Sequence, residues 1–254
     1  MPKTLTAILL LGLGAYGAAC LALFLAQRSL IYFPPAQAAI EAPTSSRMTV
    51  AGAIVKISER PRPGKQALTY LGGNAEDVSA SLPLLAAAFP DHALYLLHYR
   101  GYTGSTGKPT EQALVADALR LFDRVVADHP DVVLVGRSLG SGVALQVASM
   151  RAAHRLVLIT PYDSMADLAA RQFPYFPVRW LLRDTYKSVR HAPRITTPTV
   201  LLTAEHDEII PASSSARLLS AFPTGVAHLQ VIEGAGHNTI SARPGYVQAL
   251  RWAR

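Results

Sequence analysis

A serine between two glycines, Gly136-Arg-Ser138-Leu-Gly140, is the feature of this sequence with the most direct chemical meaning. It follows an apolar run, residues 132–135, that is typical of a buried strand, and a helical pattern begins at Val143. On a sharp strand-to-helix turn the positions two residues before and two residues after the serine must lack a side chain. The strained turn holds the hydroxyl above the sheet. The pattern therefore predicts a nucleophile at Ser138. The alternative, a glycine-rich turn that cradles a phosphate, has no second phosphate-binding feature in its support.

A serine hydroxyl is a weak nucleophile at neutral pH, so a base must take its proton and a carboxylate must orient that base. His237 is the predicted base, because it lies in the small-residue loop Gly234-Ala-Gly-His-Asn238 directly after the apolar strand end at 231–232. Small residues there let the loop approach the serine closely. The other histidines after Ser138 have less suitable positions: His154, His191, His206 and His228.

The predicted acid is Asp207, which follows the apolar run 199–204 and lies between the serine and the histidine in the chain. The order serine, acid, histidine is the one found where the nucleophile lies on a strand-turn-helix of this kind. Glu205 and Glu208 are neighbouring alternatives. Asp163, which follows another apolar run at 155–160, is the second choice.

The segments that must position these side chains alternate between strand and helix patterns. Strands are predicted at 48–58, 67–71, 93–99, 132–135, 155–160, 199–204 and 228–232, and helices at 76–89, 111–128, after 142, 212–222 and 246–252. This alternation predicts an α/β fold with a doubly wound, mostly parallel sheet. Ligands bind at the carboxyl ends of the strands in such sheets, where all three candidate residues would lie.

Residues 161–198 interrupt this alternation with five prolines, and we expect a small helical cap insert there. Cationic side chains and aromatic side chains are interspersed in it: Arg171, Arg179, Arg183, Lys187, Arg190, Arg194, Phe173, Tyr175, Phe176 and Trp180, against Asp167 and Asp184. This composition fits a lipid-facing patch that covers the pocket, and it equally fits an ordinary solvated face.

The N-terminal segment contains no charge from Leu5 to Ala26, which is long enough to cross a bilayer as a helix. Lys3 precedes it, and Arg28, Tyr32 and Phe33 follow, as residues at a membrane interface do. A cleaved signal peptide, a lipoprotein site at Cys20 and a buried core helix are the alternatives.

We therefore predict a transmembrane anchor over 1–33, a linker rich in proline, alanine and serine over 34–47, and a catalytic domain over 48–254. The short linker would hold the domain close to the headgroups. The charges at the two ends of the span are nearly balanced, so they do not set the side on which the domain lies.

The composition narrows the class of protein further. The 254 residues carry a formal net charge of +7, but no basic run is interleaved with aromatic residues, so no nucleic-acid partner is expected. A basic chain with an apolar anchor fits an anionic membrane surface better. The single cysteine, Cys20, precludes a disulfide within the chain and a cysteine–histidine metal cluster.

Four separated segments together resemble the α/β-hydrolase superfamily, and specifically its membrane-anchored, ABHD-type branch. They are residues 72–75, 99–111, 136–142 and 234–238. The segment 99–111, Tyr-Arg-Gly-Tyr-Thr-Gly-Ser-Thr-Gly-Lys-Pro-Thr-Glu, discriminates best, because the serine motif is shared by many hydrolases. The apolar N-terminus followed by residues 28–34 is also similar to that branch.

The resemblance implies a hydrolase with a small cap and with no metal or organic cofactor. Carried over by motif, Ser138 is the nucleophile, Asp207 the acid and His237 the base, and the amides of Leu139 and Asn74 are the oxyanion donors. The family usually has His-Gly-Asn where this chain has Gly72-Gly-Asn74, which removes one support of that loop, and Ala204 stands where a glycine is common.

These observations predict a membrane-anchored serine hydrolase that cleaves a carboxylic ester or thioester through an acyl-enzyme. The substrate would be a small or lipid-like acyl ester that reaches the pocket from the membrane, under the cap. Two alternatives remain: an acyltransferase that uses the same acyl-enzyme, and a non-catalytic membrane scaffold that keeps the fold. The sequence contains no feature that specifies the oligomeric state.

Overall fold

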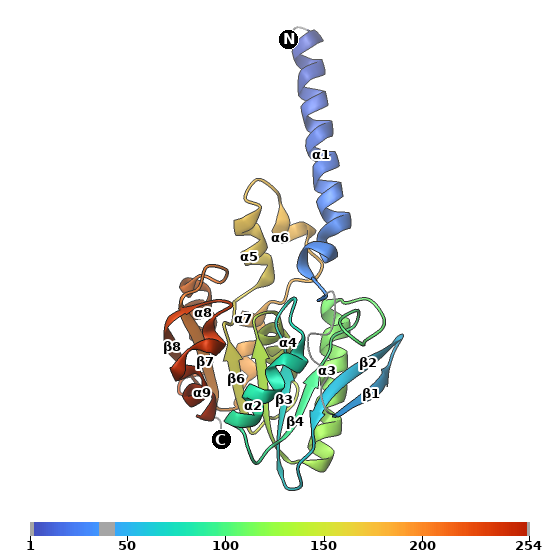
Figure 1. Cartoon of the computed structure of the whole chain (residues 1–254). Helices are drawn as coiled ribbons and strands as arrows, with labels where there is room; N and C mark the ends of the chain where they lie inside the picture. Colours follow the sequence, from blue (N-terminus) through green and yellow to red (C-terminus); the bar gives the residue numbers. More distant parts are fainter. Residues whose placement is uncertain (1–2, 36–43, 253–254) are drawn as a thin grey trace.

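A single eight-stranded sheet forms the centre of the computed structural model, which describes residues 3–35 and 44–252 (Figure 1). The strand order is β1-β2-β4-β3-β5-β6-β7-β8. Six neighbouring strands of this sheet run parallel to one another. They are β3 (Gln66–Leu71), β4 (Ala93–Leu97), β5 (Asp131–Arg137), β6 (Arg155–Ile159), β7 (Thr199–His206) and β8 (Ala227–Gly236). The edge pair, β1 (Thr44–Val50) and β2 (Ala53–Arg60), is antiparallel. The mostly parallel sheet predicted from the sequence is confirmed.

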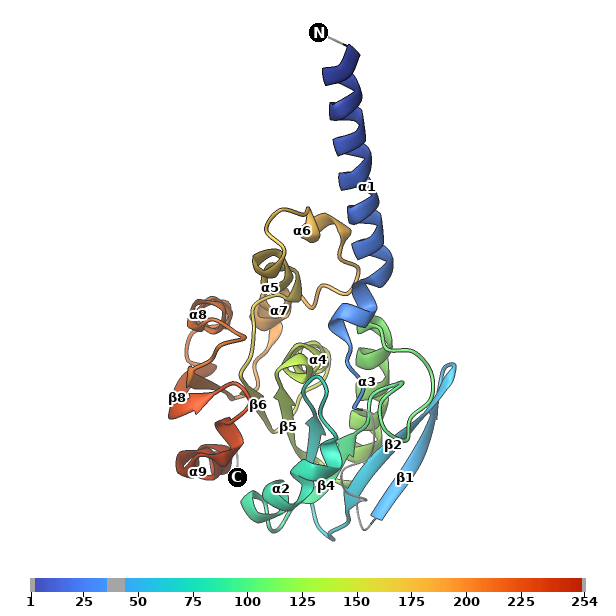
Figure 2. The same ribbon diagram turned by 45° about the horizontal axis from the view of Figure 1, so that its top comes forward.

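Helices cover both faces of this sheet, and each face has its own apolar core (Figure 2). One face is covered by α3 (Glu111–Asp128), α4 (Leu139–Ala148) and α8 (Ala212–Ser220). The other is covered by α2 (Leu82–Ala88) and α9 (Pro244–Arg251). Between its two charged ends, the central strand β5 is apolar from Val132 to Val135 because it is buried on both faces, as is usual for parallel sheets.

The predicted single strand at 48–58 is wrong in detail, because the structure has a hairpin there. β1 ends at Val50, and β2 begins at Ala53 after the two-residue turn Ala51-Gly52. Gly52 has φ +74°, a conformation that glycine adopts without strain and that tight hairpins require. β1 also begins at Thr44, so the last four residues of the predicted linker 34–47 pair with β2. Residues 36–43 lie outside the described residues.

The predicted helix at 76–89 begins later and is shorter than expected. A 3-10 turn, η1 (Val78–Ser81), is capped by the Asp77 carboxylate, and α2 then begins at Leu82 with Pro83 in its first turn. Glu76 does not join the helix, because its carboxylate turns back to accept hydrogen bonds from the Gly73 amide and the Tyr70 hydroxyl.

The N-terminal helix α1 (Lys3–Ile31) projects from the domain as a single long rod (Figure 1). Within residues 3–35 and 44–252 it is the one helix long and apolar enough to cross a membrane. The interface position predicted for Tyr32 is wrong. Tyr32 is only 3% exposed, and its hydroxyl contacts the Asp184 carboxylate at 3.1 Å and the Tyr186 hydroxyl at 2.9 Å. The end of α1 therefore packs within the α/β domain before the predicted linker begins.

The segment predicted as a cap contains four short helices, of which only the first two stand above the sheet (Figure 1). They are α5 (Met165–Gln172) and α6 (Val178–Leu181). The other two, α7 (Ser188–His191) and η2 (Ala192–Arg194), return to the sheet, where the His191 ring contacts the Ser149 hydroxyl after α4 at 3.2 Å. We use cap below for residues 161–184, which include α5 and α6.

Candidate active site

Ser138 lies on the turn between β5 and α4 with φ 47° and ψ −116°, a strained conformation for a residue with a side chain. The glycines on either side are required by close packing. A Cβ at Gly136 would lie 2.5 Å from the carbonyl oxygen of Gly140, and one at Gly140 would overlap the carbonyl oxygen of Leu71. The Ser138 hydroxyl turns to His237 rather than to the first amides of α4. The sheet and helix thus hold this hydroxyl in one orientation.

The three residues expected to act together form a continuous hydrogen-bonded chain. The Nε2 atom of His237 lies 3.0 Å from the Oγ atom of Ser138. The Nδ1 atom of the same ring lies 2.9 and 3.0 Å from the two carboxylate oxygens of Asp207. The His237 and Asp207 side chains are only 5% and 7% exposed, so the contact between them is shielded from solvent. This geometry suits removal of a proton from the serine hydroxyl.

The loop after β7 holds Asp207 as an ionised acceptor. Burial alone would raise the pKa of the Asp207 carboxyl, but hydrogen bonds from His237 and from the amides of Ile210 and Ile209 lower that pKa below its ordinary value. The two amides donate to the Oδ1 atom at 2.7 and 3.0 Å. They fix the carboxylate plane against the imidazole, so the ring has one favoured tautomer, with its proton on Nδ1.

The alternative acids have other partners. Asp163 accepts hydrogen bonds from the Ser214 hydroxyl at 2.5 Å and from the Arg217 guanidinium at 2.6 Å, so it ties the start of the cap to α8. Glu205 accepts from the Gly234 amide at 2.7 Å, and Glu208 accepts from the His237 amide at 3.0 Å. These two glutamates therefore hold the histidine loop in place through its backbone.

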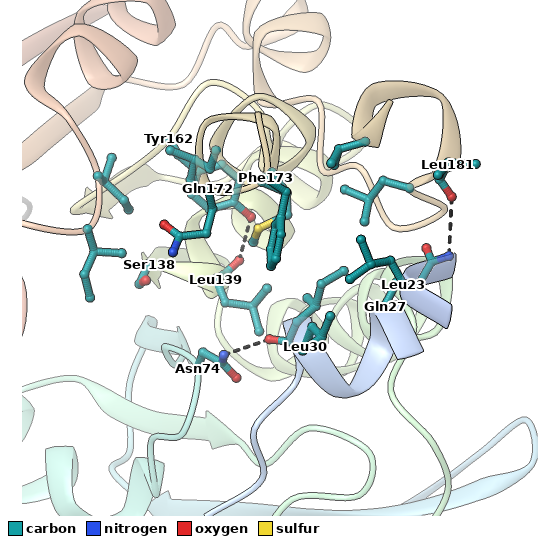
Figure 3. Close-up of a pocket in the computed structure, with 18 of the residues that line it drawn as sticks. Leu23, Gln27, Leu30, Asn74, Ser138, Leu139, Tyr162, Gln172, Phe173 and Leu181 are labelled. Carbon is teal, nitrogen blue, oxygen red and sulfur yellow. Dashed lines mark hydrogen bonds between the residues drawn. The ribbon is translucent and has the colours of Figure 1, made fainter. Parts of the chain in front are cut away.

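The two residues expected to stabilise an oxyanion lie beside the serine (Figure 3). Leu139 is the first residue of α4, where backbone amides have no acceptor within the helix. Asn74 follows β3, and its carboxamide contacts the end of α1 at the Ile31 carbonyl, 2.7 Å away. Both residues line the cavity that Ser138 faces. Their role as donors to an oxyanion stays a prediction.

Glu76 and Arg137 support the Asn74 loop, a role that the sequence did not reveal. One oxygen of Glu76 accepts from the Gly73 amide at 2.6 Å and from Arg137 at 3.0 Å, and the other accepts from Tyr70 at 2.7 Å. This carboxylate holds the loop where the family usually has a histidine in place of Gly72. The opposite charges of Glu76 and Arg137 are only a weak sequence signal of this contact. Most oppositely charged residues in a sequence lie on the surface and do not support a site.

A cavity of about 510 Å³ lies over the serine, between the cap and α1 (Figure 3). Ser138, Leu139 and His237 line its floor, which lies where β5 and β8 end. Its walls are mostly apolar and come from two segments far apart in the sequence: Met165, Leu168, Ala169, Phe173, Phe176, Val178, Leu181 and Leu182 of the cap, and Leu23, Phe24, Leu30 and Ile31 of α1. Within the described ranges, no three His, Cys, Asp or Glu side chains are grouped to hold a metal ion.

Comparison with known proteins agrees with this architecture. Residues 71–193 match the family model described as the alpha/beta hydrolase family. An uncharacterized protein of Mycobacterium tuberculosis is 34% identical over 233 residues, which cover 84% of this chain and 80% of that protein. The alpha/beta hydrolase domain-containing protein aho-3 of Caenorhabditis elegans is 31% identical over 199 residues, which cover 76% of this chain and 58% of that protein.

Among solved structures, a soluble variant of monoglyceride lipase from Saccharomyces cerevisiae, in complex with a substrate analogue, superposes with a TM-score of 0.65. The match covers 87% of this chain and 98% of that one. At 12% identity this likeness shows a shared fold alone. The family match and the relatives make this chain a member of the alpha/beta hydrolase family, in its ABHD-type branch.

Proposed function

We propose that this protein is a membrane-anchored serine hydrolase that cleaves a carboxylic ester or thioester through an acyl-enzyme on Ser138. The observation that carries the proposal is the hydrogen-bonded chain from Ser138 through His237 to Asp207 at the floor of an apolar cavity. The family match supports a hydrolase of this fold, and the length and apolar composition of α1 support the anchor.

The reaction would proceed in two balanced halves. The Oγ atom of Ser138 attacks the acyl carbon while the Nε2 atom of His237 takes its proton, and Asp207 stabilises the resulting imidazolium. The amides of Leu139 and Asn74 stabilise the negative oxygen of the tetrahedral intermediate. The intermediate collapses, and the alcohol or thiol leaves with the proton from His237. Water then attacks the acyl-enzyme with the same base, which releases the acid and restores Ser138.

The walls of the cavity support an acyl chain as the group bound beside Ser138. Apolar side chains from the cap and α1 surround the space, so an alkyl chain placed there is removed from water. The cationic side chains of the cap give less support to a lipid-like substrate than the composition of the cap suggests, because two of them have partners within the protein. Arg179 pairs with Asp167 at 2.7 Å, and Arg183 lies 4.4 Å from the centre of the Phe24 ring. The apolar walls therefore carry the proposal of a lipid-like substrate.

The test is turnover of a series of acyl esters by the full-length protein in detergent micelles. Ser138→Ala should lower kcat by about 10⁴- to 10⁶-fold, because the three residues act as one unit. The matched control is Ser149→Ala, which removes a hydroxyl bonded to the Gln146 carbonyl after the same helix and should leave turnover unchanged. Turnover by Ser138→Ala above a tenth of that of the wild type would overturn the proposal. Absence of turnover by the folded wild-type protein would favour a scaffold instead.

A further inference from the structure

We infer that the last turn of α1 is part of the active site as well as the end of the proposed anchor. It fixes the loop of residues 72–75, which carries a predicted oxyanion donor, and it closes one wall of the cavity. The inference rests on the proposed function of Ser138. It assigns a positioning role in the reaction to a helix that would otherwise serve only to attach the domain to a membrane.

The side chain of Asn74 joins the loop to the end of α1 through two hydrogen bonds in opposite directions. Its Nδ2 atom donates to the Ile31 carbonyl at 2.7 Å, and its Oδ1 atom accepts from the Phe33 amide at 2.9 Å. Ile31 is the last residue of α1, where carbonyl oxygens have no partner within the helix. A carboxamide supplies both a donor and an acceptor, so it suits this position. The loop and the helix end therefore move together.

The loop needs such restraint because its backbone is strained. Ala75, directly after Asn74, has φ 57°, a left-handed conformation that costs a residue with a side chain about 1–2 kcal/mol. Strain of this kind persists only where the surroundings fix the chain. Glu76 holds the Gly73 amide from one side, and the Tyr102 hydroxyl and the end of α1 hold Asn74 from the other. The second of these restraints depends on the position of α1.

Contacts with the cap fix the position of the last turn of α1. The Gln27 carboxamide donates to the Leu181 carbonyl at 3.3 Å (Figure 3). It also accepts from the Arg183 amide at 2.7 Å. Arg28 pairs with Asp184 at 3.1 Å, and the buried Tyr32 hydroxyl contacts the same carboxylate. These contacts give the helix end one fixed position beside the loop.

The C-terminal part of α1, from Leu23 to this last turn, also contributes directly to the space where the acyl chain would lie. Leu23, Phe24, Leu30 and Ile31 form one wall of the cavity whose floor is Ser138. The two contributions of α1 have different kinetic consequences. Loss of the hold on Asn74 displaces an oxyanion donor and lowers kcat for any ester. Loss of apolar wall weakens binding of long acyl chains only.

The experiment is a double-mutant cycle on the full-length protein in detergent micelles, with a short-chain ester as substrate. Asn74→Ala removes the side-chain link but keeps the backbone amide, and Tyr32→Phe removes the hydroxyl that holds the helix end to Asp184. Each should lower kcat by about 10-fold or more with KM within about twofold, because small displacements in an active site are costly. In the double variant the loss should not exceed that of Asn74→Ala, since both act through the same contact.

The matched control is Tyr16→Phe, which removes an exposed hydrogen bond from the middle of the same helix to the Tyr175 carbonyl, 2.9 Å away. It should leave kcat and KM unchanged. Leu30→Ala should raise KM for long-chain esters but not for short ones. If Asn74→Ala lowers the melting temperature so far that it is unfolded at the assay temperature, Tyr102→Phe, which removes one hydrogen bond to the same carboxamide, replaces it in the cycle.

Values of kcat for Asn74→Ala and Tyr32→Phe within twofold of the wild type would overturn the inference, as would losses that multiply in the double variant. These two outcomes test the inference only if the wild-type protein hydrolyses the ester and the Ser138→Ala variant does not. Wild-type and Ser138→Ala proteins that are equally inactive would overturn the proposed function, and the inference with it.

Discussion

At the scale of residues, the carboxylates after β6 and β7 have different partners, and this separates a catalytic role from a structural one. Asp207 contacts the imidazole of His237 and two backbone amides, and the pKa of its carboxyl is lowered despite its burial. Asp163 is bonded to Ser214 and Arg217 of α8. We therefore expect loss of the first to affect the reaction and loss of the second to affect the fold.

The corresponding prediction compares two conservative variants. Asp207→Asn keeps the shape of the side chain but favours the wrong tautomer of His237, so kcat should fall by about 10³- to 10⁴-fold. Asp163→Asn should leave kcat of the folded protein within a few-fold of the wild type and lower the free energy of unfolding by about 1–3 kcal/mol. Ester turnover and urea unfolding measure the two effects. The opposite pattern would transfer the role of the acid to Asp163.

The sequence allowed some of these residues to be named and not others. The three side chains that the structure joins by hydrogen bonds could be chosen because each follows a recognisable apolar strand, and parallel strands end at one edge. The contact of Asn74 with Ile31 could not be predicted. It involves a backbone carbonyl at a helix end, and its position depends on how α1 packs against the cap. Glu76 likewise had the spacing of an ordinary helix start.

At the scale of elements, the close approach of α4 to β3 and β5 holds Ser138 at the carboxyl end of the central strand β5. A side chain at Gly140 would meet backbone atoms of Leu71 and Gly72, which no rotamer change can relieve. Packing therefore requires glycine on the turn between β5 and α4, independently of any catalytic role of Ser138. This explains why Gly140 lies in the first turn of α4, although glycine lowers helix propensity there.

Gly140→Ala should consequently destabilise the fold by about 3 kcal/mol or more, since the backbone of β3 must move. Gly245→Ala is the matched control. A Cβ at this position in α9 would meet nothing within 4 Å, and alanine favours a helix over glycine, so stability should stay equal or rise slightly. Thermal unfolding followed by circular dichroism measures both. Equal melting temperatures for the two variants would contradict the packing argument.

A second element-scale feature is the buried His98 after β4, which ties β2 to η1. Its Nε2 atom lies 2.8 Å from the Ser58 hydroxyl and 3.4 Å from the Ser79 hydroxyl. Burial lowers the pKa of His98 to about 4, the charge of Lys56 also lowers it, and Asp77 opposes the shift. The folded protein thus holds this ring neutral at a pH where the unfolded chain would protonate it.

The sign of the effect follows from proton counting. Between pH 6.5 and pH 4 the unfolded state binds a proton at His98 and the folded state does not, so stability falls as pH falls. The loss amounts to about 3 kcal/mol over that interval. In His98→Gln the free energy of unfolding, measured with urea, should lose this slope. The exposed His206→Gln should keep it, and an unchanged slope in His98→Gln would contradict the assignment.

Sequence patterns predicted the order of most strands and helices because apolar periodicity reports burial directly. They missed the β1–β2 hairpin, where Ala51-Gly52 turns the chain inside a segment whose loose alternation suits one strand. They also started the helix after β3 too early, since acidic residues at 76 and 77 suit a helix start equally well. In both places local chemistry was ambiguous and tertiary contacts decided the structure.

At the scale of the whole molecule, α1 and the cap run side by side (Figures 1 and 2). The Tyr16 hydroxyl donates to the Tyr175 carbonyl, and the Tyr16 ring stacks on Phe176. Tyr16 lies about 16 Å along the helix axis from Gln27, at a rise of 1.5 Å per residue. If residues 5–26 lie in a bilayer, the end of the cap lies in the near leaflet. Tyr175 and Trp180 there are 85% and 90% exposed.

This arrangement predicts contact between Trp180 and lipid in the full-length protein. The chain has two tryptophans, so Trp252→Phe leaves Trp180 as the single fluorophore. In vesicles of brominated lipids its emission should be strongly quenched, because bromine quenches only at close contact. Trp180→Phe is the control, since the remaining Trp252 packs against His228, with ring centres 4.6 Å apart. Trp252 directly follows α9, which lies far from α6 in Figure 1. Equal quenching in both variants would contradict this orientation.

Covalent labelling by a fluorophosphonate, which traps an activated serine, identifies the nucleophile directly. Trypsin should release residues 138–151 as one peptide from the labelled full-length protein, and fragmentation distinguishes Ser138 from Ser141 and Ser149 within it. We expect a single adduct on Ser138, abolished in Ser138→Ala and formed much more slowly in His237→Ala. An adduct on another serine, or a folded wild-type protein that takes no label, would contradict this assignment.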